Sequence, residues 1–363
     1  MLHHLQAVAA HAYYTGHMAA GRDACERILR MPVLPDSVEA RTRANRTWYT
    51  QPLSKLVATS RYRRLDDEPT RERLGIRPGW SAFNPSILAT TYRGSASGML
   101  CTIRSSNYSI SGGHYTIAPE DGGVIKTVTY LARLDDDLEL FDARQIAIDY
   151  EKNGFEVTGL EDLRLNQVGE RILASATARD LGPRDGTCRI ATFEIDQHHL
   201  RAIGIACPET PGGRHEKNWM PIVGRERWVY SCSHEGHVCR VEREGDGWRV
   251  DEGPASPPVA LQFRGGSQVV PIGSDRLAVI HEVSDGDAPR RVYEHRFVRF
   301  TEKGQIIGVS PAFVFREPRA IEFCAGLAIR GERVIASFGV RDAEAWLVEL
   351  RLPEVLAMLG SPE

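Results

Sequence analysis

The sequence predicts a mainly β fold, a five-bladed β-propeller that follows a short α-helical segment. A pattern made of an apolar run, a Gly-x-Arg or Gly-x-x-Arg turn and a second apolar run occurs four times, at residues 163–178, 219–233, 269–283 and 325–340. The turn arginines lie about 50 to 57 residues apart, the period of a sheet unit that cannot bury its faces alone. A looser fifth copy covers residues 85–104, and five such units indicate five blades around one axis.

The first 50 residues carry the periodicity of helices. Apolar residues recur at helical spacing from Leu5 onward, prolines then interrupt the pattern, and a further helix is expected from about Asp36 to Tyr49. The segment resembles one tetratricopeptide hairpin, but so few helices cannot form a solenoid. We therefore expect residues 1–50 to form a cap packed on the propeller, with a docking or dimerisation surface as the alternative.

The rest of the chain divides into a connector and a propeller domain. Residues 51–79 are rich in Arg, Asp and Pro and are expected to be the connector, so the propeller spans residues 80–363. Asp135-Asp136-Asp137 lies between two strand-like runs. It fits an Asp-x-Asp metal site for a nucleotide sugar, but no Rossmann-like pattern surrounds it, so we favour a solvated hairpin turn.

Composition excludes several classes of protein. The net charge is −3 over 363 residues with both signs spread along the chain, so the basic face of a nucleic-acid-binding protein is absent. No apolar stretch approaches the ~20 residues needed to span a bilayer. Residues 1–14 lack the basic start of a signal peptide, and the seven cysteines contain no Cys-x-x-Cys pair. We expect a cytoplasmic protein with reduced thiols and neither a metal nor a cofactor.

Polar residues gather where the blades are expected to open. The first strand of each repeat should be the inner one, so the residues that begin it should face a central funnel. These are Asn84, Glu161, Asp162, Arg164, His215, Lys217, Asn218, Trp219, Arg264, Gln268 and Glu322. The second strands end in a matching set: Arg104, Asn107, Tyr108, His281, Glu282, Arg341 and Asp342. A scaffold gains nothing from so many converging charges, because each desolvated charge must be paired, so we expect a site for a polar, charged substrate.

The segment Gly159-Leu160-Glu161-Asp162-Leu163-Arg164 resembles the Gly-x-Glu-Asp-Pro-Arg motif of glycoside hydrolase family 130, the mannoside phosphorylases and β-mannosidases. Asn84-Pro85-Ser86 and Lys217-Asn218 fall where that family has similar blade-opening motifs, and the resemblance covers roughly residues 80 to 350. Leu163 departs from the motif, because the family has Pro at that position. The resemblance implies a five-bladed propeller that performs inverting glycosyl transfer on a mannoside-like carbohydrate, as a phosphorylase or as a transferase using a sugar phosphate or nucleotide sugar.

The resemblance also implies roles for single residues. Asp162 would be the general acid that protonates the departing glycosidic oxygen, and a blade-to-blade ion pair with Arg164 or a neighbouring arginine is the structural alternative. Arg164 would face phosphate, because its rigid fork suits bidentate binding of that group. From their charge, Arg104, Lys217, Arg264 and His281 are expected to add positive charge there. Glu161 is expected to hold a sugar hydroxyl or an arginine.

Two alternatives to this function remain open. An inverting hydrolase needs a second carboxylate about 6.5–9.5 Å from the first, for which Glu282 and Glu322 are the candidates, followed by Asp342. A non-catalytic glycan-binding propeller is a further alternative. Tyr108 and Trp219 are expected either to stack on a sugar ring or to pack in the core. The cap adds a surface for a protein or glycan acceptor larger than a disaccharide.

Overall fold

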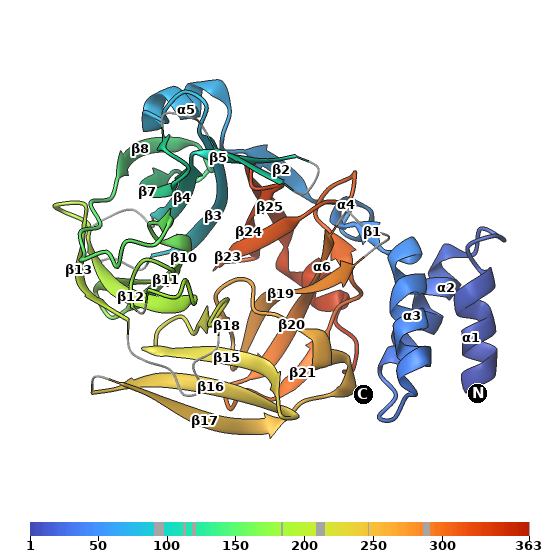
Figure 1. The fold of residues 1–363 in the computed structure, drawn as a ribbon. Coiled ribbons are helices and arrows are strands. Elements are labelled where there is room, and N and C mark those ends of the chain that lie inside the picture. Colours follow the sequence, from blue (N-terminus) through green and yellow to red (C-terminus); the bar gives the residue numbers. More distant parts are fainter. Residues whose placement is uncertain are drawn as a thin grey trace.

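Five sheets stand around one axis in the computed structural model, and three helices lie beside them (Figure 1). The structure describes residues 1–90, 98–111, 114–117, 121–182, 184–207, 215–245, 247–285 and 291–362. The predicted five-bladed propeller with N-terminal helices is confirmed. Residues 91–97, which include the turn of the looser fifth repeat, lie outside the described residues.

Each blade is one sheet, and the blades are numbered here in chain order. Blade 1 contains β3 (Ser81–Ala89), β4 (Met99–Ser106), β7 (Ile125–Leu134), β8 (Leu140–Gln145) and, beside β7, β9 (Val157–Thr158). The hairpin of β5 (Tyr108–Ser111) and β6 (His114–Ile117) leaves it. Blade 2 contains β10 (Glu161–Val168), β11 (Arg171–Ala178), β12 (Arg189–Asp196) and β13 (Arg201–Ala206). Blade 3 contains β14 (Met220–Pro221), β15 (Arg227–His234), β16 (His237–Glu244) and β17 (Gly247–Ala255).

The last two blades are completed by the beginning of the chain. Blade 4 follows η2 (Pro258–Gln262) and contains β18 (Val270–Ile272), β19 (Asp275–Asp285), β20 (Arg291–Thr301), β21 (Ile306–Val309), β22 (Phe313–Val314) and β1 (Gln51–Pro52). Blade 5 contains β23 (Glu322–Arg330), β24 (Arg333–Val340), β25 (Glu344–Arg351) and β2 (Arg61–Arg64), and α6 (Leu352–Ala357) follows it.

The recurring Gly-x-Arg pattern is the turn from the first to the second strand of blades 2 to 5. Its glycines are Gly169, Gly224, Gly273 and Gly331, with φ of 60°, 90°, 59° and 60°. A side chain is strained at such left-handed φ values, so glycine recurs at each turn. The sequence repeat therefore arises because the turn of each of these four blades needs a residue with a left-handed backbone conformation.

The N-terminal helices form a small body with its own core. They are α1 (Leu2–His11), α2 (Met18–Leu29) and α3 (Asp36–Tyr49). Leu5, Ala24, Ile28 and Tyr49 pack together between them. In Figure 1 this body stands beside blade 4, and the chain then runs from α3 into β1 and β2.

Residues 51–79, expected to be a connector, add strands to the propeller. β1 pairs in parallel with β22, and β2 pairs antiparallel with β25 as the outermost strand of blade 5. Between and after these strands lie α4 (Leu53–Leu56) and α5 (Glu68–Leu74). Blade 5 is thus built from both ends of the chain, which closes the circle of blades.

Apolar clusters between neighbouring blades hold the circle together. One cluster joins Ile87 and Cys101 of blade 1 to Ala328 and Ile335 of blade 5. All seven cysteines are free, and all except Cys207 are buried. No helix among the described residues is long and apolar enough to cross a membrane.

Candidate active site

Three blades open their inner strands with a residue in the left-handed region. Asn84, Asp162 and Asn218 have φ of 45°, 52° and 62°. Residues other than glycine pay about 1–3 kcal/mol for such strain, which persists only where surrounding contacts fix it. Asn84 donates directly to Asp162, and Arg164 donates to both Asp162 O and Asn218 Oδ1, so the strain marks a shared polar centre.

Asp162 is held as a carboxylate at this centre. Its Oδ1 accepts hydrogen bonds from Asn84 Nδ2 at 2.8 Å and from Arg104 Nη1 at 2.9 Å. Burial opposes the negative charge, but Arg104 and the bond from Asn84 outweigh burial and lower the pKa of Asp162. The side chain is 20% exposed, so a substrate can reach it. A general acid must carry a proton, so its role as that acid stays a prediction.

Glu161 lies among three cations. Its carboxylate oxygens are 3.9 Å from Arg104 Nη2, 4.0 Å from Arg179 Nε and 3.9 Å from Lys217 Nζ. These separations exceed hydrogen-bond length, so the contacts are electrostatic. The arrangement leaves the donors of Lys217 and Arg179 able to bind a further anion.

Tyr108 and Asp342 complete the centre from blades 1 and 5. The Tyr108 hydroxyl donates to Asp342 Oδ2 at 3.0 Å, and the Arg104 guanidinium lies 5.9 Å from the centre of the Tyr108 ring. Burial raises the pKa of Asp342, although Arg104 acts against this. Tyr108 is 5% exposed, so its ring packs inside the protein and does not offer an open face for a sugar.

Arg164 supports this centre from below its surface. Its Nε donates to Gly266 O at 2.6 Å, its Nη1 to Asp162 O at 3.1 Å and its Nη2 to Asn218 Oδ1 at 3.2 Å. Burial lowers the pKa of Arg164 to about 10. The residue is 1% exposed, so the structure places it as a brace between blades 2, 3 and 4, and its contact with phosphate stays a prediction.

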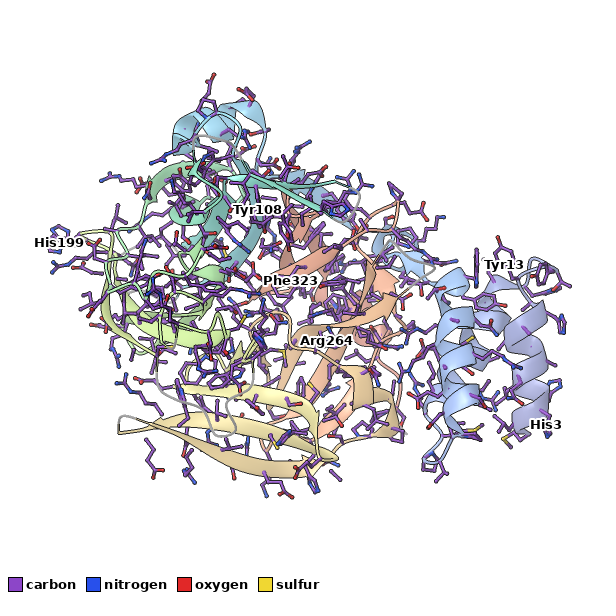
Figure 2. The ribbon with its side chains drawn as sticks, in the orientation of Figure 1. His3, Tyr13, Tyr108, His199, Arg264 and Phe323 are labelled. Atoms are coloured by element: carbon purple, nitrogen blue, oxygen red, sulfur yellow. The ribbon has the colours of Figure 1, made fainter. Side chains whose placement is uncertain are left out.

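His281 and Arg264 lie beside Arg164. The His281 ring stacks on Tyr293 with ring centres 4.9 Å apart. Burial lowers the pKa of His281 to about 3, with Arg264 and Arg164 adding to the effect. His281 is therefore neutral near pH 7 and does not supply the expected positive charge, whereas Arg264 is exposed. Figure 2 shows Tyr108, Phe323 and Arg264 gathered toward the middle of the propeller.

The two carboxylates expected to activate water have other partners. Glu282 is paired with Arg46 of α3 at 2.9 Å, in a buried cluster between the cap and blade 4. Both oxygens of Glu322 accept backbone hydrogen bonds, from Phe315 N at 2.7 Å and Arg316 N at 2.8 Å. Burial raises the pKa of Glu322 to about 8. The structure does not bring these two groups into the cluster around Asp162.

Several other residues expected at the site make structural contacts. Gln268 Nε2 donates to Ile87 O at 2.8 Å, and Gln268 Oε1 accepts from Leu327 N at 2.8 Å. Gln268 therefore ties blade 4 to blades 1 and 5 in the buried centre. Asn107 uses both amide atoms on the backbone of Val124 and Lys126.

Blade 3 has a similar structural group. Trp219 is 1% exposed, and its Nε1 donates to Glu216 Oε2 at 3.0 Å. Its ring packs on Trp248, with ring centres 5.2 Å apart. His215 Nδ1 accepts from Cys188 N at 3.1 Å. Core packing is therefore the role that the structure gives to Trp219.

Two further residues contribute to the site, although the sequence analysis did not identify them. Asp180 accepts hydrogen bonds from the Tyr150 hydroxyl at 2.7 Å and from Gly159 N at 3.0 Å. Gly159 lies just before Glu161 and Asp162 in the chain, so this bond fixes the backbone that leads into the site. Arg179 is one of the three cations around Glu161. Both follow the second strand of blade 2, so the rule that identified strand-end residues in the other blades would have found them.

Among the described residues, no group of three or more His, Cys, Asp or Glu is placed to hold a metal ion. Asp135–Asp137 forms the turn between β7 and β8, with Asp137 N donating to Asp135 Oδ1 at 2.9 Å.

Comparison with known proteins gives likenesses in structure only. No protein-family model and no curated protein matches the chain. The β-1,2-mannobiose phosphorylase from Listeria innocua matches with a TM-score of 0.55 and 13% identity, over 82% of this chain and 98% of that one. A second match comes from work on the GH130 family of mannoside phosphorylases, which contains glycoside hydrolases that target β-1,2 mannosidic linkages in Candida mannan. Its TM-score is 0.54 and its sequence identity 14%, over 78% of this chain and 88% of that one. A glycosyl hydrolase from Bacteroides ovatus matches with a TM-score of 0.51 and 14% identity, over 74% of this chain and 84% of that one. These likenesses show that the chain shares the five-bladed fold of those proteins.

Proposed function

We propose that this protein transfers a mannoside-like glycosyl group between phosphate and a sugar acceptor, with inversion, at the centre around Asp162. The observation that carries the proposal is the excess of positive charge there. Arg104, Arg179 and Lys217 surround Glu161. A neutral glycoside does not need so many cations, whereas phosphate does.

The exposed cations are the ones that would bind phosphate. The backbone at Gly265 lies against Asn218, where an added Cβ would be 1.8 Å from the Asn218 carbonyl oxygen. Lys217 and Arg264 flank this contact in the chain, so their side chains leave the backbone near one another. The Lys217 side chain is 40% exposed. Arg164 lies below and acts through Asp162 and Asn218.

A phosphate-dependence assay tests the proposal. The protein is incubated with β-1,2-mannobiose, with and without inorganic phosphate, and free mannose and mannose 1-phosphate are separated by chromatography. We expect mannose 1-phosphate only when phosphate is present. In Lys217→Ala, the KM for phosphate should rise about 10-fold, the effect of losing one charge-assisted contact. The matched control is Lys55→Ala, because Lys55 is exposed on α4 and outside the site.

Hydrolysis is the second candidate, and one observation favours it. Asp162, Asp342 and Glu161 all lie close to Arg104. The site thus holds the second carboxyl group that a hydrolase needs, even though Glu282 and Glu322 lie outside it. Equal release of mannose with and without phosphate would establish the hydrolase and contradict phosphorolysis. Turnover only with a nucleotide sugar or sugar phosphate donor would identify a transferase. Binding of glycans without turnover of any of these substrates would identify a non-catalytic propeller.

The cap offers a surface for a larger acceptor. Tyr13, Tyr14 and Trp48 are 43%, 83% and 59% exposed, and the Tyr13 and Trp48 ring centres are 5.5 Å apart. Aromatic rings of this kind bind sugars or protein surfaces. Trp48→Ala should weaken use of long acceptors but not of disaccharides, if the cap contributes to acceptor binding.

A further inference from the structure

Asp342 lies at the tip of a strained turn between β24 and β25. Arg341 and Asp342 are both left-handed, with φ of 56° and 51°. The turn is held by Arg341 N, which donates to Ile321 O at 2.8 Å, and by Ala343 N, which donates to Val340 O at 3.0 Å. Two such residues in succession are costly, at about 1–3 kcal/mol each, so this turn fixes where the Asp342 carboxyl lies.

Asp162 and Asp342, two of the three carboxyl groups at the centre, have different partners. Asp162 accepts from Asn84 and from the charged Arg104, at 2.8 and 2.9 Å. Asp342 accepts from the neutral hydroxyl of Tyr108 at 3.0 Å. Two carboxyl groups in contrasting surroundings adopt different protonation states, and this contrast separates an acid from an anion.

We propose that Asp342 donates the proton to the departing glycosidic oxygen, while Asp162 remains a carboxylate that binds or stabilises the sugar. The assignment rests on the proposed function and names the acid of that same site. It replaces Asp162, which resemblance alone suggested for this role.

The surrounding charges are consistent with this division. Four titratable groups face Asp342: Arg104 from β4, Tyr108 from β5, and Glu161 and Asp162 from β10. Burial is the largest influence and raises the pKa of Asp342, and the negative charges of Asp162 and Glu161 add to it. Arg104 and the Tyr108 hydroxyl act in the opposite direction without reversing it.

In the proposed step, one bond to the sugar breaks and one forms. The Asp342 proton moves to the glycosidic oxygen while the bond between that oxygen and sugar C1 breaks, and the electron pair of that bond stays on the oxygen. A lone pair of inorganic phosphate forms the new bond to C1 from the opposite face. Asp342 is left as a carboxylate that Tyr108 and Arg104 can stabilise. In the reverse direction, Asp342 takes the proton back from the acceptor hydroxyl.

Leaving-group dependence tests the assignment. Asp342→Asn and Asp162→Asn are assayed in phosphate on β-1,2-mannobiose and on 2,4-dinitrophenyl β-mannoside, whose leaving group departs without a proton. In Asp342→Asn, kcat on mannobiose should fall about 100-fold or more, because the leaving group there needs a proton. On the aryl substrate, kcat of the same variant should fall less than about 10-fold. In Asp162→Asn, kcat should fall by a similar factor on both substrates, because the negative charge of Asp162 is needed with either of them. The control is the exposed Asp149→Asn, and thermal melting verifies that each variant folds.

The pH profile provides a second, independent readout. The alkaline limb of kcat reports ionisation of the acid in the complex. Because the Tyr108 hydroxyl lowers the pKa of Asp342, Tyr108→Phe should move that limb to higher pH, which a purely structural role would not do.

The outcomes separate this assignment from the proposed function. Rescue of Asp162→Asn, but not of Asp342→Asn, by the aryl substrate would overturn the assignment and leave phosphorolysis intact. An alkaline limb unchanged in Tyr108→Phe would also count against it. If the wild-type protein turned over neither substrate, with or without phosphate, the proposed function and this assignment would both fail.

Discussion

Arg46 of the cap and Glu282 of blade 4 form an ion pair of 2.9 Å in which each side chain is only 3% exposed. Arg46 also binds Glu294 at 2.5 Å, and Arg296 binds Glu26 of α2 at 2.7 Å. Arg43 is 3.0 Å from Glu282 and 2.8 Å from Glu39, so three arginines and four glutamates meet where the helices join the propeller. The cap is therefore joined to blade 4 by a buried network of ion pairs.

Removal of Arg46 should strongly destabilise the protein. Arg46→Met would leave Glu282 and Glu294 buried without their main partner, and breaking a buried ion pair costs about 3–5 kcal/mol. Urea unfolding followed by circular dichroism measures the change. In the control Arg351→Met, Arg351 pairs with Glu332 at 3.6 Å and both side chains are more than half exposed. That change should cost less than about 1 kcal/mol, and similar losses in both variants would contradict a special role for the cluster.

The same cluster should make stability depend on pH in the acid range. Burial opposes the charges of Glu26 and Glu282, but the neighbouring arginines outweigh it and hold both pKa values below the ordinary value of 4.5. Groups with lowered pKa stabilise the fold above the unfolded-state value, and this stabilisation is lost as the pH falls through the folded-state values. The free energy of unfolding should therefore fall steadily below about pH 4.5.

Urea titrations at a series of pH values measure this dependence. Arg46→Met, in which the partner that lowers these pKa values is missing, should show a flatter acid dependence than the wild type. An equal acid slope in both proteins would show that other carboxylates cause it.

The sequence predicted the propeller because one physical requirement recurs in it. The left-handed glycine of each first turn, such as Gly169 or Gly331, has to appear at every blade, and apolar strands flank it. The closing strand β2 was missed because Arg61–Arg64 shows no apolar alternation, and its partner β25 lies at the other end of the chain.

The candidate site could be predicted only in part. Asn84 and Asp162 were expected to face a common centre because their local motifs are visible in the sequence, and the structure brings the two side chains together. Glu282 looked equally available, yet its partner Arg46 is 236 positions away, and no local pattern reveals such a pairing. A polar residue that opens a strand is thus either a ligand group or half of a buried pair, and only the fold decides which.

Gln268 should behave as a structural residue and not as a substrate ligand. Gln268→Leu would leave Leu327 N–H and Ile87 O without their partner at the buried centre. Each unsatisfied buried group costs about 1–3 kcal/mol, so the melting temperature should fall clearly. The KM for mannoside should stay unchanged below the melting range. A large rise in KM with little loss of stability would instead support the role predicted from the sequence.

Gly339 should be needed for activity, because it leaves room for Asn84. A Cβ at Gly339 would lie 2.0 Å from Asn84 Oδ1 and 2.6 Å from Asn84 N, so Gly339→Ala must displace the residue that binds Asp162. We expect a loss of about 1–3 kcal/mol in stability from overpacking. We also expect a fall in kcat, because Asp162 loses a hydrogen bond that fixes its carboxylate.

Gly331→Ala separates these two effects. Gly331 lies on the same blade with a φ of 60° and open space around it, so the change costs about 1–2 kcal/mol of backbone strain without touching Asn84. The two variants should therefore lose similar stability, whereas only Gly339→Ala should lose turnover at a temperature where both are folded. If both variants kept full turnover, the contact between Gly339 and Asn84 would not be what positions Asp162.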